Sequence, residues 1–204
     1  MARKKNIAGE GARGTGIVLE LPSSGSLVAT EYGPRDAAEL VLTVHGIAHE
    51  LVSEWEDTGI ATAAALAGYR VVCLNFHSNS ALKPGEADTA TIVTAIDEVL
   101  VALNYPHAVL MGKSWGGKVA VAVAAARPEK ITKLVLSAPA FGMAPEDAAV
   151  LSKLKMPICL GWSEDDVTIP HKTHLVYTSS GARRHRRTAA VAGRFFFRHC
   201  DPTA

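Results

Sequence analysis

One pattern dominates the sequence between residues 40 and 161: short apolar runs alternate with longer segments of helical character. The apolar runs occupy residues 40–46, 70–76, 107–113, 133–139 and 157–162. The helical segments occupy residues 53–68, 89–105, 116–129 and 145–153. Strands that alternate with helices form β-α-β units. The sequence therefore predicts an α/β fold, with a mostly parallel, twisted sheet and helices on both faces.

Two further strands precede this pattern. Residues 17–21 and 26–32 are joined by a Pro-Ser-Ser-Gly turn and predict a β-hairpin, which would form the antiparallel edge of the sheet. With 204 residues and no linker or repeat, the chain suits a single domain over residues 17–204, after a flexible tail of residues 1–16. The pattern weakens after His171: a helix near 171–180 and a strand near 194–200 are open options, and we expect residues 180–204 to be irregular.

The charge balance and the cysteines restrict the compartment and the partners. Lys and Arg number 21 against 20 Asp and Glu, so nothing global attracts nucleic acid, and the basic runs at 3–5 and 183–187 are expected to be solvated. Cys73 and Cys159 lie in apolar runs as small hydrophobic side chains, and three widely spaced cysteines predict neither a disulfide framework nor a zinc site. No run is long enough to span a bilayer. We expect a cytoplasmic protein, although the basic N-terminus leaves organelle targeting open.

A serine between a strand and a helix carries the strongest chemical signal. Gly112-Lys113-Ser114-Trp115-Gly116 fits G-x-S-x-G, with an apolar strand before it and an alanine- and valine-rich helix after it. In such a strand-to-helix turn the serine hydroxyl is exposed above the sheet edge, and the helix N-terminus points at the site where negative charge develops. The context predicts that Ser114 is a nucleophile at an elbow, rather than an incidental serine in a glycine-rich turn.

Three landmarks in order resemble the α/β-hydrolase superfamily over about residues 17–175. They are Val-His-Gly-Ile at 44–47, the serine elbow, and the segment 161–170, GWSEDDVTIP. The resemblance implies an oxyanion hole made by the backbone N–H groups of Ile47 and Trp115, with His45 holding the loop by hydrogen bonds. It also places the acid of the triad four residues before Pro170, at Asp166, with the neighbouring Asp165 as the alternative in register.

The same resemblance places the histidine of the triad after Asp166. His171 and His174 follow too closely to return over the serine, and His185 lies among arginines. His199 follows three phenylalanines at a distance that accommodates a helix and a strand, so it is the candidate base. The superfamily's glycine-containing loop before this histidine and its last helix have no counterpart here. We therefore expect a C-terminus that is shortened relative to the superfamily.

Two other departures concern the surroundings of the site. Asn75 stands where relatives often have an acidic residue, and we expect His77, Ser78 and Asn79 to bond their own loop rather than substrate. The connection from Ser137 to Pro157 is too short for the helical cap that many relatives insert, so an open site without a cap domain is expected. Phe141 and Met143 at its start either line an acyl pocket or serve ordinary packing.

The sequence thus favours a serine hydrolase of carboxylesterase type, with Ser114, Asp166 and His199 as its triad and a small acyl ester or thioester as its substrate. No cofactor and no metal ion is implied, and the oligomeric state is not indicated. A second hypothesis stays open: a non-catalytic scaffold of the same fold with an incomplete triad, whose exposed sheet edge and aromatic tail bind a partner.

Overall fold

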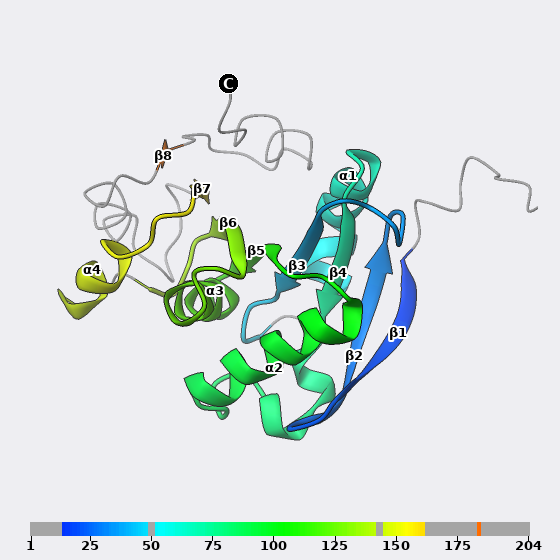
Figure 1. Ribbon diagram of the computed structural model, residues 1–204, viewed down its shortest axis with the longest axis horizontal. Coiled ribbons are helices and arrows are strands. Elements are labelled where there is room, and N and C mark those ends of the chain that lie inside the picture. Colours follow the sequence, from blue (N-terminus) through cyan, green and yellow to red (C-terminus); the bar gives the residue numbers. More distant parts are fainter. Residues whose placement is uncertain (1–13, 49–51, 142–144, 162–182, 185–204) are drawn as a thin grey trace, which may run out of the picture.

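The computed structural model describes residues 14–48, 52–141, 145–161 and 183–184, and within them an eight-stranded mixed sheet lies between helices (Figure 1). The strand order is β1-β2-β4-β3-β5-β6-β7-β8. The strands are β1 (Thr15–Leu21), β2 (Gly25–Tyr32), β3 (Leu40–Val44), β4 (Arg70–Leu74), β5 (Ala108–Lys113), β6 (Ile131–Ser137), β7 (Ile158–Gly161) and β8 (Arg183–Arg184). β2 pairs antiparallel with both β1 and β4, and all other neighbouring strands pair in parallel. The predicted fold class and the antiparallel edge hairpin are confirmed.

Burial along the strands follows their place in the sheet. Leu19, Leu21, Leu27 and Ala29 of the edge hairpin point into the core, and the residues between them face outward. The central β3 is buried at all five positions, as expected for a parallel strand covered on both faces. The carboxyl ends of β3, β5, β6 and β7 therefore meet at one edge of the sheet, where Ser114 follows β5.

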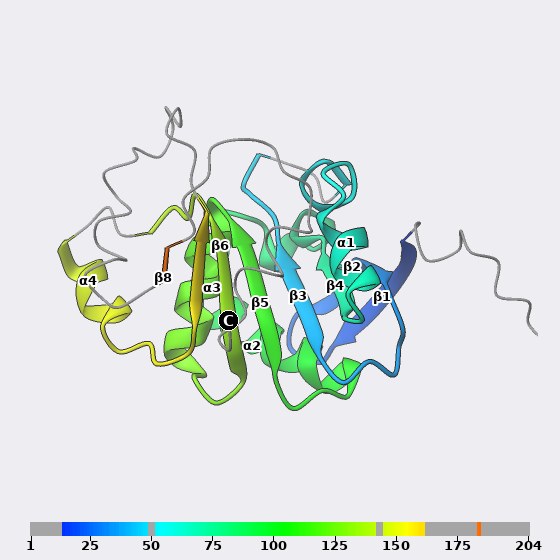
Figure 2. The ribbon, with the colours of Figure 1, turned by 90° about the horizontal axis from the view of Figure 1, so that it is seen from above.

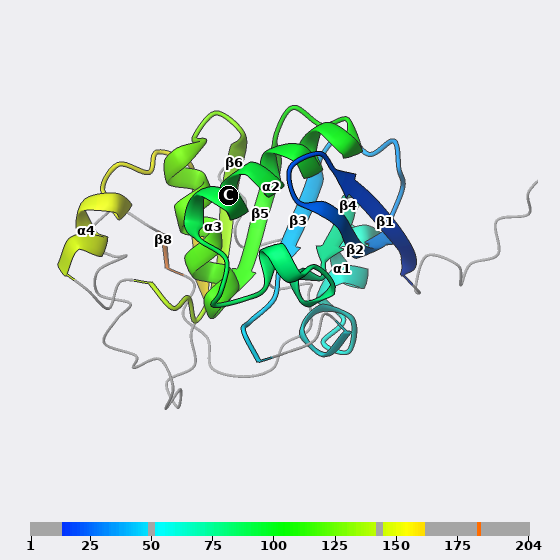
Figure 3. The same cartoon turned by 90° about the horizontal axis from the view of Figure 1, so that it is seen from below.

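Helices cover both faces of this sheet (Figure 2). One face carries α1 (Ile60–Leu66) and the π-helical turn η2 (Val52–Glu56), which bury Trp55 and three alanines of α1. The other face carries α2 (Thr89–Leu103), α3 (Trp115–Ala126) and α4 (Pro145–Leu151) (Figure 3). The apolar face predicted for residues 89–105 packs into this larger cluster, since Ile92, Ile96, Val99 and Leu103 are all buried.

The predicted helix over residues 53–68 is wrong in extent. The chain forms η2, turns at Asp57–Gly59 and only then begins α1. Gly59 adopts φ 72°, a left-handed conformation that glycine accepts without a steric cost. The break lets η2 direct Glu54 and Trp55 inward while α1 presents its alanines to the sheet.

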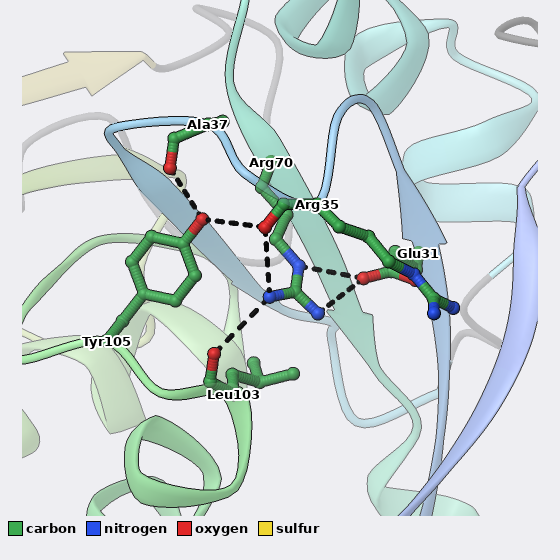
Figure 4. Close-up of polar contacts among 6 residues, drawn as sticks. All are labelled: Glu31, Arg35, Ala37, Arg70, Leu103 and Tyr105. Carbon is green, nitrogen blue, oxygen red and sulfur yellow. Dashed lines mark hydrogen bonds and ion pairs between the residues drawn. The ribbon is translucent and has the colours of Figure 1, made fainter.

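A buried ion pair braces the edge of the sheet opposite to Ser114 (Figure 4). The guanidinium of Arg70 lies 2.6 Å from Oε1 of Glu31 on β2, and Arg35 binds the second carboxylate oxygen at 2.7 Å. Arg70 also donates to the carbonyl of Leu103, and the hydroxyl of Tyr105 donates to the carbonyl of Ala37 at 2.6 Å. The turn after α2 is thus tied to the start of β4.

The last part of the described chain departs from the sequence prediction in two ways. Arg183 and Arg184, expected in an irregular basic stretch, form β8 beside β7. Cys159 on β7 is disulfide-bonded, whereas Cys73 is a buried free thiol, so the expectation of a plain apolar thiol is correct only for Cys73. The options at 171–180 and 194–200 lie outside the described residues. No helix in the described ranges is long and apolar enough to cross a membrane.

Candidate active site

Ser114 occupies a strained turn between β5 and α3. Its backbone angles are φ 52° and ψ −117°, a combination that side-chain-bearing residues rarely adopt. The turn is held by its own backbone: the Ser114 N–H donates to Ser137 at 3.0 Å, and the Ser114 carbonyl accepts from Ala140 and Gly117. The strain is therefore fixed by the neighbouring β6, which is the arrangement predicted for a nucleophile elbow.

The glycines of the elbow are required by close backbone packing. A Cβ on Gly112 would overlap the Gly116 carbonyl, and a Cβ on Gly116 would overlap the Val44 carbonyl at the end of β3. A Cβ on Gly117 would come within 2.5 Å of Pro139. The elbow thus packs directly on the loop that follows β3, which brings Trp115 and the segment 45–47 together.

The side chain of Ser114 is half-buried, and its hydroxyl makes no hydrogen bond to another described residue. Ser114 is the N-cap of α3, yet its hydroxyl makes no capping hydrogen bond. A serine at this position usually satisfies one of the first N–H groups of its helix. Here the positive end of a twelve-residue helix and a free hydroxyl face the same edge, which suits a group that attacks a carbonyl.

His45 holds the loop after β3 and is fully buried. Its Nδ1 lies 2.7 Å from the Gly46 carbonyl, and its Nε2 accepts the N–H of Phe76 at 3.1 Å. These partners fix the neutral tautomer that carries its proton on Nδ1. The ring also stacks on His77 with 4.9 Å between centroids. The prediction that His45 holds this loop by hydrogen bonds is confirmed.

Ile47 and Trp115 lie on two segments that pack closely together at Gly116. As the first residue of α3, Trp115 has no intrahelical acceptor for its N–H, and neither this N–H nor that of Ile47 donates to another described residue. The indole packs edge-on against Phe76 at 5.7 Å, and the Ile47 side chain lies over Gly85. Two backbone donors are therefore available beside the elbow.

The loop after β4 is occupied with its own hydrogen bonds. Asn75 Oδ1 accepts the His77 N–H, and Ser78 Oγ links the Asn75 carbonyl to the N–H of Val28. The buried Asn79 donates to the carbonyl of Ser24 in the β1–β2 turn and to that of Ser26 at the start of β2. Ser78 and Asn79 therefore serve the backbone, as the sequence predicts.

Sequence reasoning missed one pair at the site. Lys113 directly precedes Ser114 and forms an ion pair with Glu54 of η2. The only signal in the sequence is the lysine inside G-x-S-x-G, which needs an anionic partner if it is to stay near a buried strand end.

The predicted acid and base lie outside the described residues. These are Asp166, its alternative Asp165, and the histidines 171, 174, 185 and 199, and their roles stay predictions. The described geometry bears on them only through β7: Gly161 pairs with Ser137, whose carbonyl accepts the Ser114 N–H. β7 therefore ends at Gly161, with β6 between it and the strand that leads into the elbow, and Gly161 precedes Asp166 by five residues in the sequence.

The connection between β6 and β7 is described in part. The part of residues 138–157 that the structure describes contains one helix, α4, and Phe141 is buried in the larger apolar cluster, while Met143 lies outside the described residues. Among the described residues, no group of three or more His, Cys, Asp or Glu side chains is placed to hold a metal ion.

Comparison with known families decides the classification. A family model described as the alpha/beta hydrolase fold matches residues 39–172, which include the loop after β3, the elbow and the acidic segment. The chain belongs to the α/β-hydrolase fold family. Comparison of this α/β-hydrolase with curated proteins finds no match.

Solved α/β-hydrolase structures share the fold at low sequence identity. A predicted CIB-like hydrolase from Thermoplasma acidophilum has a TM-score of 0.75 at 16% identity, over 84% of this chain and 85% of that one. Carboxylesterase CesB from Bacillus subtilis has a TM-score of 0.70 at 15% identity, over 84% and 82%. The thioesterase domain from the curacin biosynthetic pathway has a TM-score of 0.68 at 17% identity, over 84% and 91%. At these identities the likeness establishes the fold alone.

Proposed function

We propose that this α/β-hydrolase is a serine hydrolase that cleaves a carboxylic ester or thioester through an acyl-enzyme on Ser114. The observation that carries the proposal is the elbow itself: a strained serine whose hydroxyl is free of capping duty at the N-terminus of α3. Strain of this kind persists only where the surrounding structure holds it, and it is concentrated at functional sites. The carboxylesterase and thioesterase among the structural relatives are consistent with this chemistry.

In the proposed reaction Oγ of Ser114 attacks the carbonyl carbon while His199 takes the hydroxyl proton. Asp166 orients the imidazole, and the N–H groups of Ile47 and Trp115 bind the oxyanion of the tetrahedral intermediate. The intermediate expels the alcohol or thiol, which receives the proton from His199, and leaves an acyl-Ser114 ester. Water, deprotonated by the same imidazole, then attacks this ester and releases the acid and the free serine.

Labelling with a fluorophosphonate probe tests the nucleophile, since the probe reacts only with an activated serine. Wild type is expected to be labelled, Ser114→Ala is not, and Ser152→Ala, which alters an exposed serine of the α4–β7 connection, is labelled like wild type. Silence from folded wild type would instead support the non-catalytic scaffold.

The histidine is tested with p-nitrophenyl acetate. His199→Ala is expected to lower kcat by at least about 1,000-fold, because the triad acts as a unit. His185→Ala serves as the matched control for a histidine in the same part of the sequence. A His199→Ala enzyme as fast as wild type removes His199 from the mechanism.

A further inference from the structure

A pocket that no comparison assigns lies between the start of α2 and residues 115–123 of α3. Figure 3 shows these two helices side by side. Its volume is about 170 Å³. The segment before α2 closes it on a third side. The lining residues are Gly85, Ala87, Thr89, Ile92, Val93, Trp115, Lys118, Val119, Ala122 and Val123.

Three buried apolar residues line the floor of this pocket, and polar residues stand at its opening. Ile92, Val119 and Val123 are 4%, 5% and 1% exposed, so they form the floor and bring only carbon atoms to it. Thr89 and Lys118 are exposed and stand at the opening. Whatever enters must therefore present an uncharged, apolar part to the floor, because a buried charge or unpaired polar group would find no partner there.

Small residues leave this space open. Gly85, Ala87 and Ala122 line it where larger side chains would fill it. An apolar cavity of about 150 Å³ in a protein interior is large enough to bind benzene. The pocket thus has room for a phenyl ring or a chain of roughly six carbons.

Two lining residues connect the pocket to the elbow. Trp115 lines it, and the backbone N–H of the same residue is one of the two proposed oxyanion donors. Gly85 also lines it, and Ile47, the other proposed donor, packs its side chain onto Gly85: a Cβ there would lie 2.9 Å from Ile47 Cδ1. The pocket is therefore bounded by residues of, or in contact with, both donors.

We propose that this pocket receives the apolar end of the substrate's acyl group, so that the enzyme prefers acyl chains of about six carbons, or a benzoyl-sized group, over acetyl. The proposal rests on the proposed function, because an acyl group reaches the pocket only while its carbonyl lies at Ser114 and the two N–H groups. It adds the substrate class: short- to medium-chain or aromatic acyl esters and thioesters.

Binding is tested first, without catalysis. In the Ser114→Ala protein, benzene is expected to raise the Tm and to shift the NMR signals of residues on α2 and α3. Ala122→Leu in that background fills the pocket and abolishes both effects. Ala125→Leu, the same substitution at an exposed position of α3, preserves them. Absence of benzene binding by the Ser114→Ala protein and by wild type overturns the proposal.

Specificity is tested second, with p-nitrophenyl hexanoate and p-nitrophenyl acetate. Wild type is expected to show a kcat/KM at least about tenfold higher for the hexanoate, since a single methylene in an apolar pocket is worth that much. Ala122→Leu lowers the hexanoate-to-acetate ratio by at least about tenfold. Ala87→Val, a smaller filling change, lowers it less, and Ala125→Leu leaves it unchanged. A ratio unaffected by Ala122→Leu in an active, folded enzyme overturns the acyl assignment.

The two experiments separate this inference from the proposed function. Fluorophosphonate labelling of Ser114 with no chain-length preference refutes the pocket proposal and leaves the hydrolase intact. Benzene binding by a protein that neither reacts with the probe nor cleaves any ester refutes the hydrolase, and with it the acyl occupant.

Discussion

Glu54 and Lys113 form an ion pair that joins η2 to the residue before the proposed nucleophile. Oε1 of Glu54 lies 2.5 Å from Nζ of Lys113. The carboxylate side chain is 1% exposed, whereas the lysine side chain is 40% exposed. Because Glu54 belongs to η2 and Lys113 directly precedes Ser114, the pair fixes the position of η2 relative to the elbow. The carboxylate stays buried only while a cation compensates its charge.

Removing the lysine alone is therefore expected to be more harmful than removing both charges. Lys113→Met should lower the free energy of unfolding by roughly 2–4 kcal/mol, because it removes the cation that pairs with a buried carboxylate. Adding Glu54→Gln to Lys113→Met should recover at least about half of this loss. Urea unfolding measures both. A double variant as unstable as Lys113→Met would show that the charge of Glu54 is not what the lysine compensates.

The tight contact between Gly116 and the end of β3 predicts a large effect from one methyl group. Gly116→Ala would place a Cβ against the backbone carbonyls of Val44 and His45. These carbonyls cannot make room for it unless the elbow also moves. We expect a loss of about 3 kcal/mol or failure to fold. Gly16→Ala is the matched control, because a Cβ on Gly16 has nothing within 4 Å. Soluble expression and thermal melting distinguish the two, and a Gly116→Ala protein as stable as Gly16→Ala would contradict the close packing of the elbow.

His45 gives a third prediction, which separates a structural histidine from an exposed one. His45→Leu removes the acceptor of the Phe76 N–H and leaves that buried group unpaired, which costs about 1–3 kcal/mol. Fluorophosphonate labelling should also slow, since the loop that carries Ile47 loses its anchor. His77→Leu removes only the exposed ring of the stack and should change the free energy of unfolding by less than about 1 kcal/mol. Equal effects of the two substitutions would contradict the role of the His45 hydrogen bonds.

The sequence predicts those parts of the molecule that depend on patterns among neighbouring residues. The alternation of apolar runs and helical segments indicates the parallel sheet, because each strand and helix shows its own period. The elbow is equally local: Gly112, Ser114 and Gly116 lie within five residues and need only the preceding strand and the following helix. The buried His45 was predicted through the family resemblance rather than through its own surroundings.

The parts that could not be predicted depend on contacts between distant segments. Glu54 and Lys113 are 59 residues apart, and nothing in either neighbourhood indicates that they meet. The break in the helix at Gly59 was not predicted because the segment 53–68 is rich in alanine and has a helical composition on both sides of the break. Helical propensity was outweighed there by the tertiary placement of Glu54 and Trp55. The pocket beside Trp115 likewise arises from the gap between two helices that the sequence places separately.

The brace in Figure 4 predicts that two arginines bound to one carboxylate contribute unequally. The Glu31 side chain is 4% exposed, Arg70 is 12% exposed and Arg35 is 69% exposed. Arg70→Met should lower the free energy of unfolding by about 2–3 kcal/mol, since the buried carboxylate then keeps only a solvent-screened partner. Arg35→Met should cost less than about 1 kcal/mol. Chemical denaturation of both variants tests this ranking, and the reverse order would refute the brace.

Cys73 predicts a specific dependence of stability on pH. Burial raises the pKa of its thiol from the usual 9.0 to about 12, a hydrogen bond with Thr43 opposes the shift, and the charge of Glu56 adds to it. The folded state therefore keeps the thiol proton at pH values where the unfolded chain has lost it. The contribution is complete below about pH 9 and is lost progressively as the pH rises toward about 12.

Comparison of wild type with Cys73→Ala isolates this contribution, since all other titrating groups are common to both proteins. Cys73→Ala lowers the free energy of unfolding at pH 8 because it removes a buried sulfur atom. As the pH rises, however, the free energy of unfolding of this variant should fall less steeply than that of wild type. By pH 10 the difference in the free energy of unfolding between the two proteins should have narrowed by about 1.4 kcal/mol. The reason is that at this pH the thiol is ionised in the unfolded chain but still protonated in the folded protein. Urea unfolding at both pH values, under reducing conditions, measures the change. A gap that stays constant from pH 8 to pH 10 would mean that the thiol ionises as readily in the folded protein as in the unfolded chain.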